Sequence, residues 1–280
     1  MNKAKVIILA GQSNAVGVGF VKYLKDHFDN ETVEEILAGY EDVQINYVSH
    51  DIRSGGFVKT GVNCTEASKD TLGPEVGIAK VLTKKYAGEK IYIIKCAFGG
   101  TSLTYDWISP ESGAPYDPEI EADVKNAIND PRYRFAGWCY NSYIKALENG
   151  FSSLVAMGLE PEVVAFCWMQ GESDAEMGIP TEKYIDIYDK MLLDMKKRFA
   201  PYFDGCKYIE AGISERWPNF ESYNEAKKEY AKSNGHIYLD TIGAGLTTLN
   251  EPHEEPDTAH YDVNCVIKLG EMFDEMAKGQ

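Results

Sequence analysis

Short runs of mostly apolar residues recur along the chain, each bounded by polar or glycine-containing segments. Runs of this kind are typical of strands that are buried on both faces of a sheet. We expect strands at Val6–Leu9, Ile45–Val48, Ile91–Cys96, Val163–Met169, Tyr208–Ala211 and Ile237–Leu239.

Most of these runs are separated by longer segments with helical periodicity and a charged face. The first begins with Pro74, which suits the first position of a helix, and ends before Gly88. We expect helices at Pro74–Ala87, Tyr140–Leu159, Thr181–Phe199, Phe220–Ser233 and Asp262–Lys278. Buried strands that alternate with helices predict an α/β fold, a three-layer α/β/α sandwich around a central parallel sheet. The 280 residues are enough for one such domain, 1–280, and no composition change marks a boundary.

Two segments interrupt this alternation. Residues Arg53 to Leu72 are rich in Gly, Thr and Ser, and residues Trp107 to Arg134 contain four prolines. We expect both to be long loops. Long ordered loops in a compact domain usually shape a binding site, although a plain surface insertion is the alternative.

The formal net charge is −16 and the pI is near 4.8. This charge repels phosphates and anionic lipid, so it disfavours nucleic acid and membrane surfaces as partners and favours a neutral substrate.

No apolar run is long enough to span a bilayer. The first residues lack the pattern of a signal peptide, and the six cysteines are scattered singly. We therefore expect reduced thiols and a cytoplasmic protein, or a secreted one if a signal peptide was removed. The oligomeric state is not predicted.

Ligands of open α/β sheets bind beyond the carboxyl ends of the strands, and the residues there are unusually polar. Gly11-Gln12-Ser13-Asn14 follows the first strand, where a serine on a turn projects its hydroxyl from the sheet edge. Its own N–H can face developing negative charge. Taken alone, such a serine is more often a helix cap.

Two further motifs follow buried strands. Gly99 and Gly100 let the backbone approach a ligand and offer an unobstructed N–H, or they simply form a tight turn. After Met169, the amide of Gln170 can donate to an oxyanion, and the carboxylates behind it can hold loops through backbone N–H groups. The alternative is that these residues cap the next segment.

A base for the serine is found near the C-terminus, just before the last predicted helix. Asp257 and His260 stand three residues apart, a spacing that allows the carboxylate to orient the imidazole. An isolated pair of this kind is usually a surface pair or a helix cap. Together, however, the four motifs supply the different parts of one acyl-transfer site, and we interpret them as such.

These blocks make the chain resemble the SGNH (GDSL-type) hydrolases, whose fold is flavodoxin-like. Within that superfamily it is most similar to the carbohydrate-esterase branch with acetylxylan esterases and the sialate O-acetylesterase-like domain. The similarity rests on Val6–Asn14, Leu72-Gly73-Pro74-Glu75, Ala97–Leu103, Trp168–Asp174 and Asp257–Tyr261. The Gly-x-Asn-Asp block of typical superfamily members is absent, and Gln170-Gly171-Glu172 stands in its place, as in that branch.

The resemblance implies a serine esterase that removes O-acetyl groups from a carbohydrate, such as an acetylated xylo-oligosaccharide or sialic acid. Ser13 would be the nucleophile, His260 the general base and Asp257 its orienting carboxylate. The oxyanion hole would consist of the N–H of Ser13, an N–H from Gly99 or Gly100, and the side chain of Gln170. No cofactor is implied, and no ligand cluster has zinc or calcium spacing.

Several residues are candidates for substrate contact. Aromatic rings in the loops can stack on a sugar or can simply pack in the protein; they are Tyr105, Trp107, Tyr116, Trp138 and Trp217. Arg216 can pair with a substrate carboxylate. Gln12 and Glu172 lie beside the expected catalytic groups.

Two alternatives stay open. A non-catalytic carbohydrate-binding protein can share this fold, because fold does not imply activity. An acyltransferase would use the same acyl-enzyme and pass the acyl group to another alcohol. A dinucleotide site is disfavoured, because Gly17-Val18-Gly19 is followed by Lys22 where a third glycine is required.

Overall fold

The central sheet confirms the α/β prediction. The computed structural model describes residues 2–49, 52–65, 70–114, 135–248, 251 and 259–275. Within them, the sheet has the strand order β10-β9-β8-β1-β7-β3-β4, and β5 pairs with β3. The strands are β1 (Asn2–Gly11), β3 (Tyr40–Ser49), β4 (Ile52–Arg53), β5 (Val58–Thr60), β7 (Ile91–Ala97), β8 (Leu159–Met169), β9 (Lys207–Ala211) and β10 (Ile237–Leu239).

The six strands predicted from the sequence are all present and pair in parallel. At the edge, β4 and β5 pair with β3 in antiparallel orientation, and β2 (Gly19–Phe20) pairs with β6 (Thr71–Leu72) in a separate small sheet. The prediction of a long loop at Arg53–Leu72 is therefore wrong in part. These strands are two or three residues long, and such short pairings need no apolar pattern.

The predicted helices are present with small shifts in their ends, and further short helices join them. The α-helices are α1 (Ser13–Val16), α2 (Leu24–His27), α3 (Asn30–Ala38), α4 (Pro74–Lys85), α6 (Trp138–Ala156), α7 (Glu172–Glu176), α8 (Thr181–Phe199), α9 (Phe220–Asn234) and α10 (Val263–Glu275), and 3₁₀ turns cover Val21–Tyr23, Pro110–Ser112 and Ala200–Tyr202. Residues 115–134, most of the second predicted loop, lie outside the described residues. Within the described ranges, no helix is both long and apolar enough to cross a membrane.

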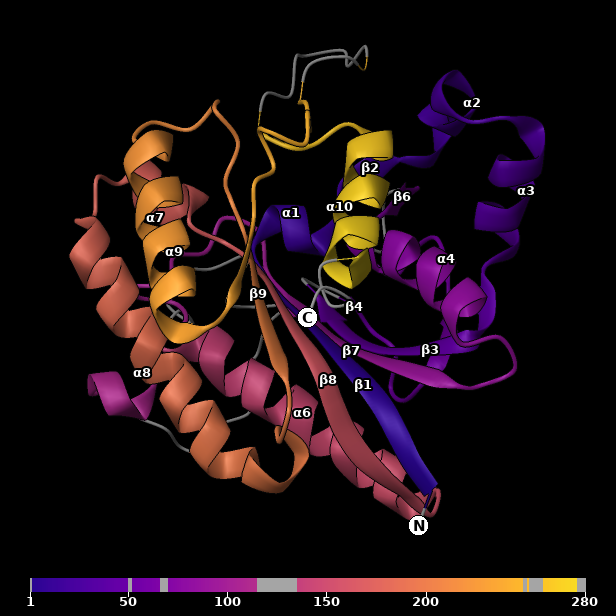
Figure 1. The fold of residues 1–280 in the computed structure, drawn as a ribbon, viewed down its shortest axis with the longest axis horizontal. Helices are drawn as coiled ribbons and strands as arrows, with labels where there is room; N and C mark the ends of the chain where they lie inside the picture. Colours follow the sequence, from indigo (N-terminus) through magenta and orange to yellow (C-terminus); the bar gives the residue numbers. More distant parts are fainter. Residues whose placement is uncertain are drawn as a thin grey trace.

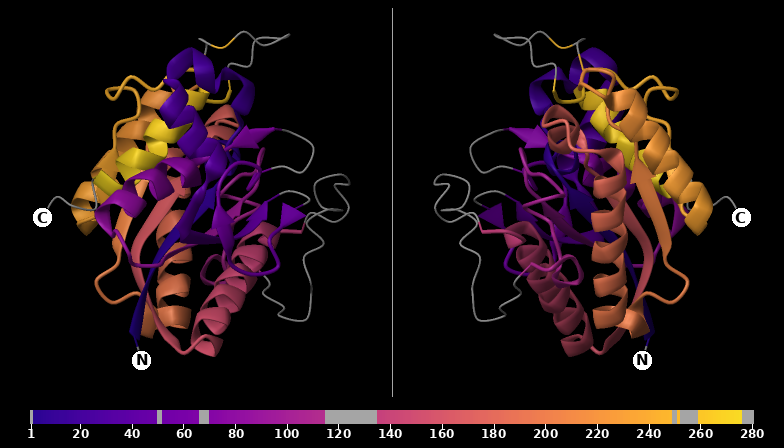
Figure 2. Two further views of the ribbon diagram at one scale, coloured as in Figure 1. Left: turned by 90° about the vertical axis from the view of Figure 1, so that its right-hand side faces the viewer. Right: turned by 90° about the vertical axis from the view of Figure 1, so that its left-hand side faces the viewer.

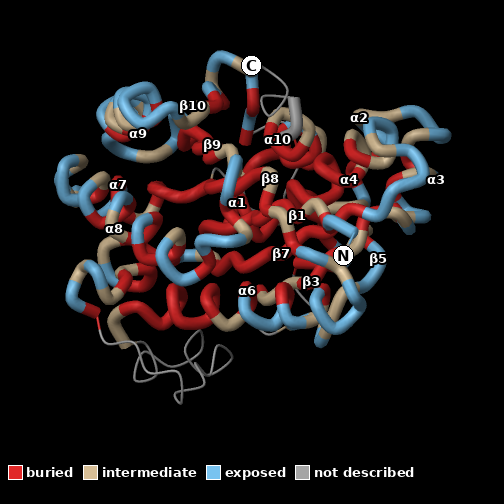
Figure 3. The backbone as a smooth tube through the Cα atoms, turned by 60° about the horizontal axis from the view of Figure 1, so that its bottom comes forward, coloured by how far each residue is buried: buried red, intermediate tan, exposed pale blue. Residues whose placement is uncertain are grey.

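Helices cover both faces of the sheet (Figures 1 and 2). The helices α4 and α10 pack together on one face, while α6 lies against β3, β7 and β8 on the other. The strands between them, β1, β7 and β8, run through the buried centre of the molecule (Figure 3). All six cysteines lie in the described residues as free thiols, most of them in this interior.

The contact between α4 and α10 is close because glycines face each other. A Cβ at Gly270 would stand 2.0 Å from the carbonyl oxygen of Pro74, and one at Gly77 would stand 1.9 Å from that of Ile267. We expect Gly270→Ala to destabilise the protein by about 1–3 kcal/mol, because the clash is with backbone that cannot rotate away. Urea unfolding measures this. Gly61→Ala is the control, since its Cβ would meet only an ordinary contact; equal stability of the two variants would contradict the prediction.

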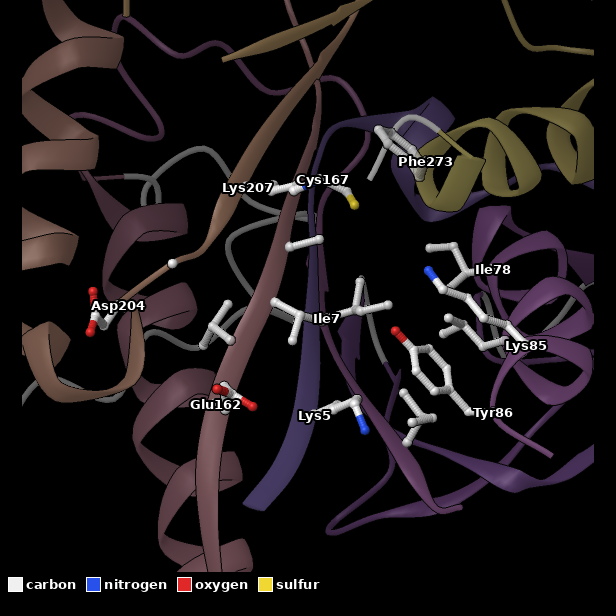
Figure 4. Close-up of a pocket in the computed structure, with 16 residues that line it drawn as sticks. Lys5, Ile7, Ile78, Lys85, Tyr86, Glu162, Cys167, Asp204, Lys207 and Phe273 are labelled. Atoms are coloured by element: carbon white, nitrogen blue, oxygen red, sulfur yellow. The ribbon is translucent and has the colours of Figure 1, made fainter. Parts of the chain in front are cut away.

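An apolar cavity of about 240 Å³ lies on the sheet face beside α4 and α10 (Figure 4). Its floor includes Ile7 of β1 and Val163 of β8, and charged residues such as Lys5 and Glu162 surround it. These residues precede the carboxyl ends of their strands. The polar motifs predicted to carry the chemistry lie beyond those ends, so this cavity is separate from them.

Candidate active site

Ser13 is the first residue of α1, directly beyond the end of β1. Gly11 makes this turn with a φ of +141°, and a Cβ there would lie 2.0 Å from the carbonyl oxygen of Met169, so only glycine fits. The backbone N–H of Gln12 donates to the same oxygen at 3.0 Å. Ser13 is 8% exposed, and no acceptor for its N–H is recorded among the described residues. The serine therefore stands at the sheet edge with a small opening to solvent.

Asn14 joins this turn to the C-terminal part of the chain. Its side-chain nitrogen donates to the carbonyl oxygen of Ala259 at 3.2 Å, and its side-chain oxygen accepts the backbone N–H of Tyr261 at 3.1 Å. These two backbone groups flank His260 on either side. The residue next to Ser13 thus holds the segment that carries the predicted base, although the two lie more than 240 positions apart in the sequence.

The loop that follows the glycine turn after β7 is held to α7 by Asp174. Its carboxylate accepts the backbone N–H groups of Leu103 at 2.7 Å and Thr104 at 3.1 Å, and also the hydroxyl of Thr104 at 2.8 Å. Asp174 is fully buried. This confirms that a carboxylate behind Gln170 holds a loop through its backbone N–H groups.

Gln170 is fully buried, and both hydrogens of its amide are engaged. The nitrogen donates to Asp174 at 2.7 Å and to the carbonyl oxygen of Thr101 at 3.2 Å. Both partners only accept hydrogen bonds, so the amide group must have its nitrogen on this side. In this arrangement, Gln170 ties the glycine turn to the end of β8 and has no spare N–H for an oxyanion.

A buried lysine supports the same strand end from behind. Lys227 of α9 donates to the carbonyl oxygens of Gln170, at 2.7 Å, and of Ala211. Burial lowers the pKa of Lys227 to about 8, while Glu210 and Glu172 act in the opposite direction. Tyr223, Lys227 and Ala231 form the buried face of α9. The sequence signal for Lys227 is a lysine at helical spacing between Tyr223 and Ala231, and the strand-end motifs do not include it.

A second buried lysine supports α1. Lys95 of β7 donates to the carbonyl oxygen of Val16 at 2.7 Å, to that of Cys64 at 3.0 Å, and to the carboxylate of Glu75 at 2.7 Å. The side chains of Lys95 and Glu75 are both fully buried. Burial raises the pKa of Glu75, and Lys95 opposes this effect. Lys95 thus anchors Val16, the last residue of the helix α1 that begins at Ser13.

Other predicted site residues are placed as follows. Asp257 and Tyr116 lie outside the described residues. Gly99 is half-buried and Gly100 exposed, with open space where a Cβ would be. Tyr105 and Arg216 are exposed, and Trp217 is half-buried.

Four candidates for substrate contact are buried inside the protein. Trp107 and Trp138 are fully buried, and their ring nitrogens donate to Thr101 and Asp106. Because these rings are buried, they cannot stack on a sugar. The prediction of sugar contact is therefore wrong for both residues, which pack in the core near the glycine turn. Gln12 and Glu172 are likewise buried; Gln12 contacts Ser173, and Glu172 accepts a hydrogen bond from Asn14. A direct contact with substrate does not fit either residue.

Comparisons with known proteins agree with this architecture. A family model described as "Carbohydrate esterase, sialic acid-specific acetylesterase" matches residues 3–278. A solved structure of a protein from Arabidopsis thaliana is 18% identical, with a TM-score of 0.65 and 98% of both chains covered. The structure of NanS is 16% identical, with a TM-score of 0.67, and the match covers 99% of this chain and 96% of NanS.

A carbohydrate acetylesterase from Xanthomonas citri is 14% identical, with a TM-score of 0.57; the match covers 96% of this chain and 54% of that one. At these identities the solved structures establish a shared fold. The comparison with curated proteins gave no match.

Proposed function

The chain belongs to the sialic acid-specific acetylesterase family of carbohydrate esterases, and from this premise we propose that it removes O-acetyl groups through an acyl-enzyme on Ser13. Membership makes it a carboxylic ester hydrolase that acts on carbohydrates. The observation that carries the residue assignment is the pair of hydrogen bonds between Asn14 and the backbone on both sides of His260, one donated by Asn14 and one accepted by it. They tie the residue after the proposed nucleophile to the segment that carries the proposed base, which supports the assignment.

In the proposed mechanism, His260 takes the proton of the Ser13 hydroxyl while the oxygen bonds to the acetyl carbonyl carbon. The tetrahedral intermediate collapses as the bond to the sugar oxygen breaks, and His260 returns the proton to that oxygen. Water, deprotonated by the same imidazole, then attacks the acetyl-serine ester; the bond to the Ser13 oxygen breaks, the imidazole returns the proton to that oxygen, and acetate is released. Asp257 is proposed to orient the imidazole.

The oxyanion that forms on the carbonyl oxygen needs preorganised donors. We assign this role to the N–H of Ser13 and to an N–H of the Gly99-Gly100 turn. Gln170 and Asp174 are proposed to fix that turn in position, because their side chains connect it to the end of β8. Gln170 can donate to the oxyanion itself only if it releases one of its two present partners.

The substrate is tested with a panel of acetylated saccharides, scored by acetate release. The panel includes O-acetylated sialic acid, acetylated xylo-oligosaccharides and p-nitrophenyl acetate. Hydrolysis of at least one sugar ester supports the proposal. Acetyl transfer to an added sugar without acetate release would identify an acyltransferase instead. Glycan binding without labelling of Ser13 by a fluorophosphonate would identify a non-catalytic binding protein.

Arg216 offers a prediction about the kind of sugar. It is exposed in the segment after the carboxyl end of β9, where ligands of α/β sheets bind. We expect Arg216→Ala to raise KM for an O-acetylated sialic acid by roughly 2- to 10-fold, since exposed ion pairs are weak, and to leave KM for a neutral acetylated xylo-oligosaccharide unchanged. Lys183→Ala, on the exposed side of α8, is the control. An equal effect on both sugars would contradict recognition of the carboxylate.

A further inference from the structure

Glu172 is a fully buried carboxylate that the proposed mechanism does not use. It is the first residue of α7, next to the end of β8. One of its oxygens accepts the side-chain N–H of Asn14 at 3.0 Å, and the other has no hydrogen-bond partner among the described residues. Burying a carboxylate without full compensation is costly, so its presence here calls for a function.

The bond from Asn14 to Glu172 completes a chain of contacts to His260. The side-chain nitrogen of Asn14 donates to Glu172 and to the carbonyl oxygen of Ala259, and its side-chain oxygen accepts the backbone N–H of Tyr261. A carboxylate can only accept hydrogen bonds, so it fixes which way the amide faces. With the nitrogen held toward Glu172, the amide oxygen is left to accept the N–H of Tyr261. Glu172, Ala259 and Tyr261 therefore all require the same orientation of the amide, and Glu172 anchors this amide to α7.

The charges near Glu172 come from several elements. Burial raises the pKa of Glu172, whereas the Asn14 hydrogen bond, Lys227 of α9 and His260 lower it. The buried hydroxyls of Tyr184, on α8, and Tyr261 also lie within the electrostatic reach of this carboxylate. A cation on α9 and the imidazole of His260 thus both interact with one buried anion.

We propose that Glu172 is a positioning residue of the active site, whose side chain accepts a hydrogen bond from Asn14 and so holds Asn14 against the His260 segment. The inference rests on the proposed function, because it requires His260 to act as the base for Ser13. Glu172 touches neither the substrate nor Ser13 and acts through Asn14 and His260.

The test removes the acceptor of Glu172 and then restores it. Glu172→Leu leaves no acceptor for Asn14, whereas Glu172→Gln keeps an oxygen that can accept from it. The matched control is Glu210→Leu, because Glu210 is also fully buried and one of its oxygens has no hydrogen-bond partner among the described residues. For each variant, kcat and KM are measured on p-nitrophenyl acetate, with thermal unfolding measured in parallel.

We expect Glu172→Leu to lower kcat by about 10- to 100-fold with little change in KM, because a small displacement of a catalytic group costs roughly this much. Glu172→Gln should keep most of the kcat, since it keeps an acceptor for Asn14. Glu210→Leu should keep the kcat of the unmodified protein.

An unchanged kcat in Glu172→Leu would overturn the proposal, and so would an equal loss of kcat in Glu210→Leu or in Glu172→Gln. Loss of activity only in proportion to loss of folded protein would also overturn it, since it would show a purely structural role. Failure of the proposed function looks different. In that case the unmodified protein itself would show no esterase activity and no labelling of Ser13.

Discussion

Replacing Ser13 by alanine is expected to lower turnover of an acetyl ester by about 10⁶-fold, to below detection, while the fold stays intact. The size follows from losing the nucleophile of a covalent mechanism, for which other serine hydrolases show losses on that order. The change removes one oxygen from a residue that is already 8% exposed and that lies at a turn fixed by Gly11. Little loss of stability is therefore expected. Acetate release and fluorophosphonate labelling measure the result.

Ser152→Ala is the matched control for this prediction, because Ser152 is exposed on α6. It should keep full activity and full labelling. Retained turnover in Ser13→Ala would assign the nucleophile to another residue and would remove the basis of the proposed mechanism.

Replacing Lys95 by methionine is expected to destabilise the protein by about 3–5 kcal/mol. The change leaves the carboxylate of Glu75 buried without its cation, and breaking a buried pair from one side usually costs this much. It also removes the donor to the carbonyl oxygen of Val16, so α1 is held less firmly. Urea unfolding at pH 7 measures the loss. The double variant Lys95→Met with Glu75→Gln should recover part of it, because the uncompensated charge is then absent.

The stability of Lys95→Met should also depend on pH in a defined direction. Burial already raises the pKa of Glu75, and without Lys95 only backbone N–H groups, such as that of Gly73, oppose the effect. The folded state then binds more protons than the unfolded state above the pKa of an exposed glutamate, so stability falls as pH rises. The deficit relative to the unmodified protein should be smaller at pH 5 than at pH 8. A deficit independent of pH would show that Glu75 does not carry the penalty.

The parallel strands could be predicted because strands buried on both faces are nearly continuous apolar runs. Val163–Met169, for example, lies within the observed β8, which starts earlier at Leu159. The helix α3 was not predicted, although its sequence carried a signal: the side chain of Asp29 caps it by accepting the N–H of Thr32, and Gly39 follows it. The edge strands β4 and β5 had no such signal, because their pairing depends on the exposed backbone edge of β3.

The site was predictable as a set of motifs and less so as individual contacts. The resemblance to carbohydrate esterases is confirmed by the family match over residues 3–278. Trp107 has the residue type of a sugar platform, yet it is fully buried, since the fold packs it against Phe98 and Trp168. The residues that hold the motifs together, Asn14 and Asp174, belong to those motifs, but their partners are distant in sequence.

By itself, the sequence determined the fold class, the family and the order of the polar motifs, because apolar periodicity and strand-end residues are local properties of the chain. Only the tertiary structure decided which of those polar groups are buried and what each one contacts. Whether Gln170 has a spare N–H, or what Glu172 accepts from, depends on neighbours in other elements, namely Thr101, Asp174 and Asn14. Such contacts arise from packing between distant segments, and no local pattern encodes them.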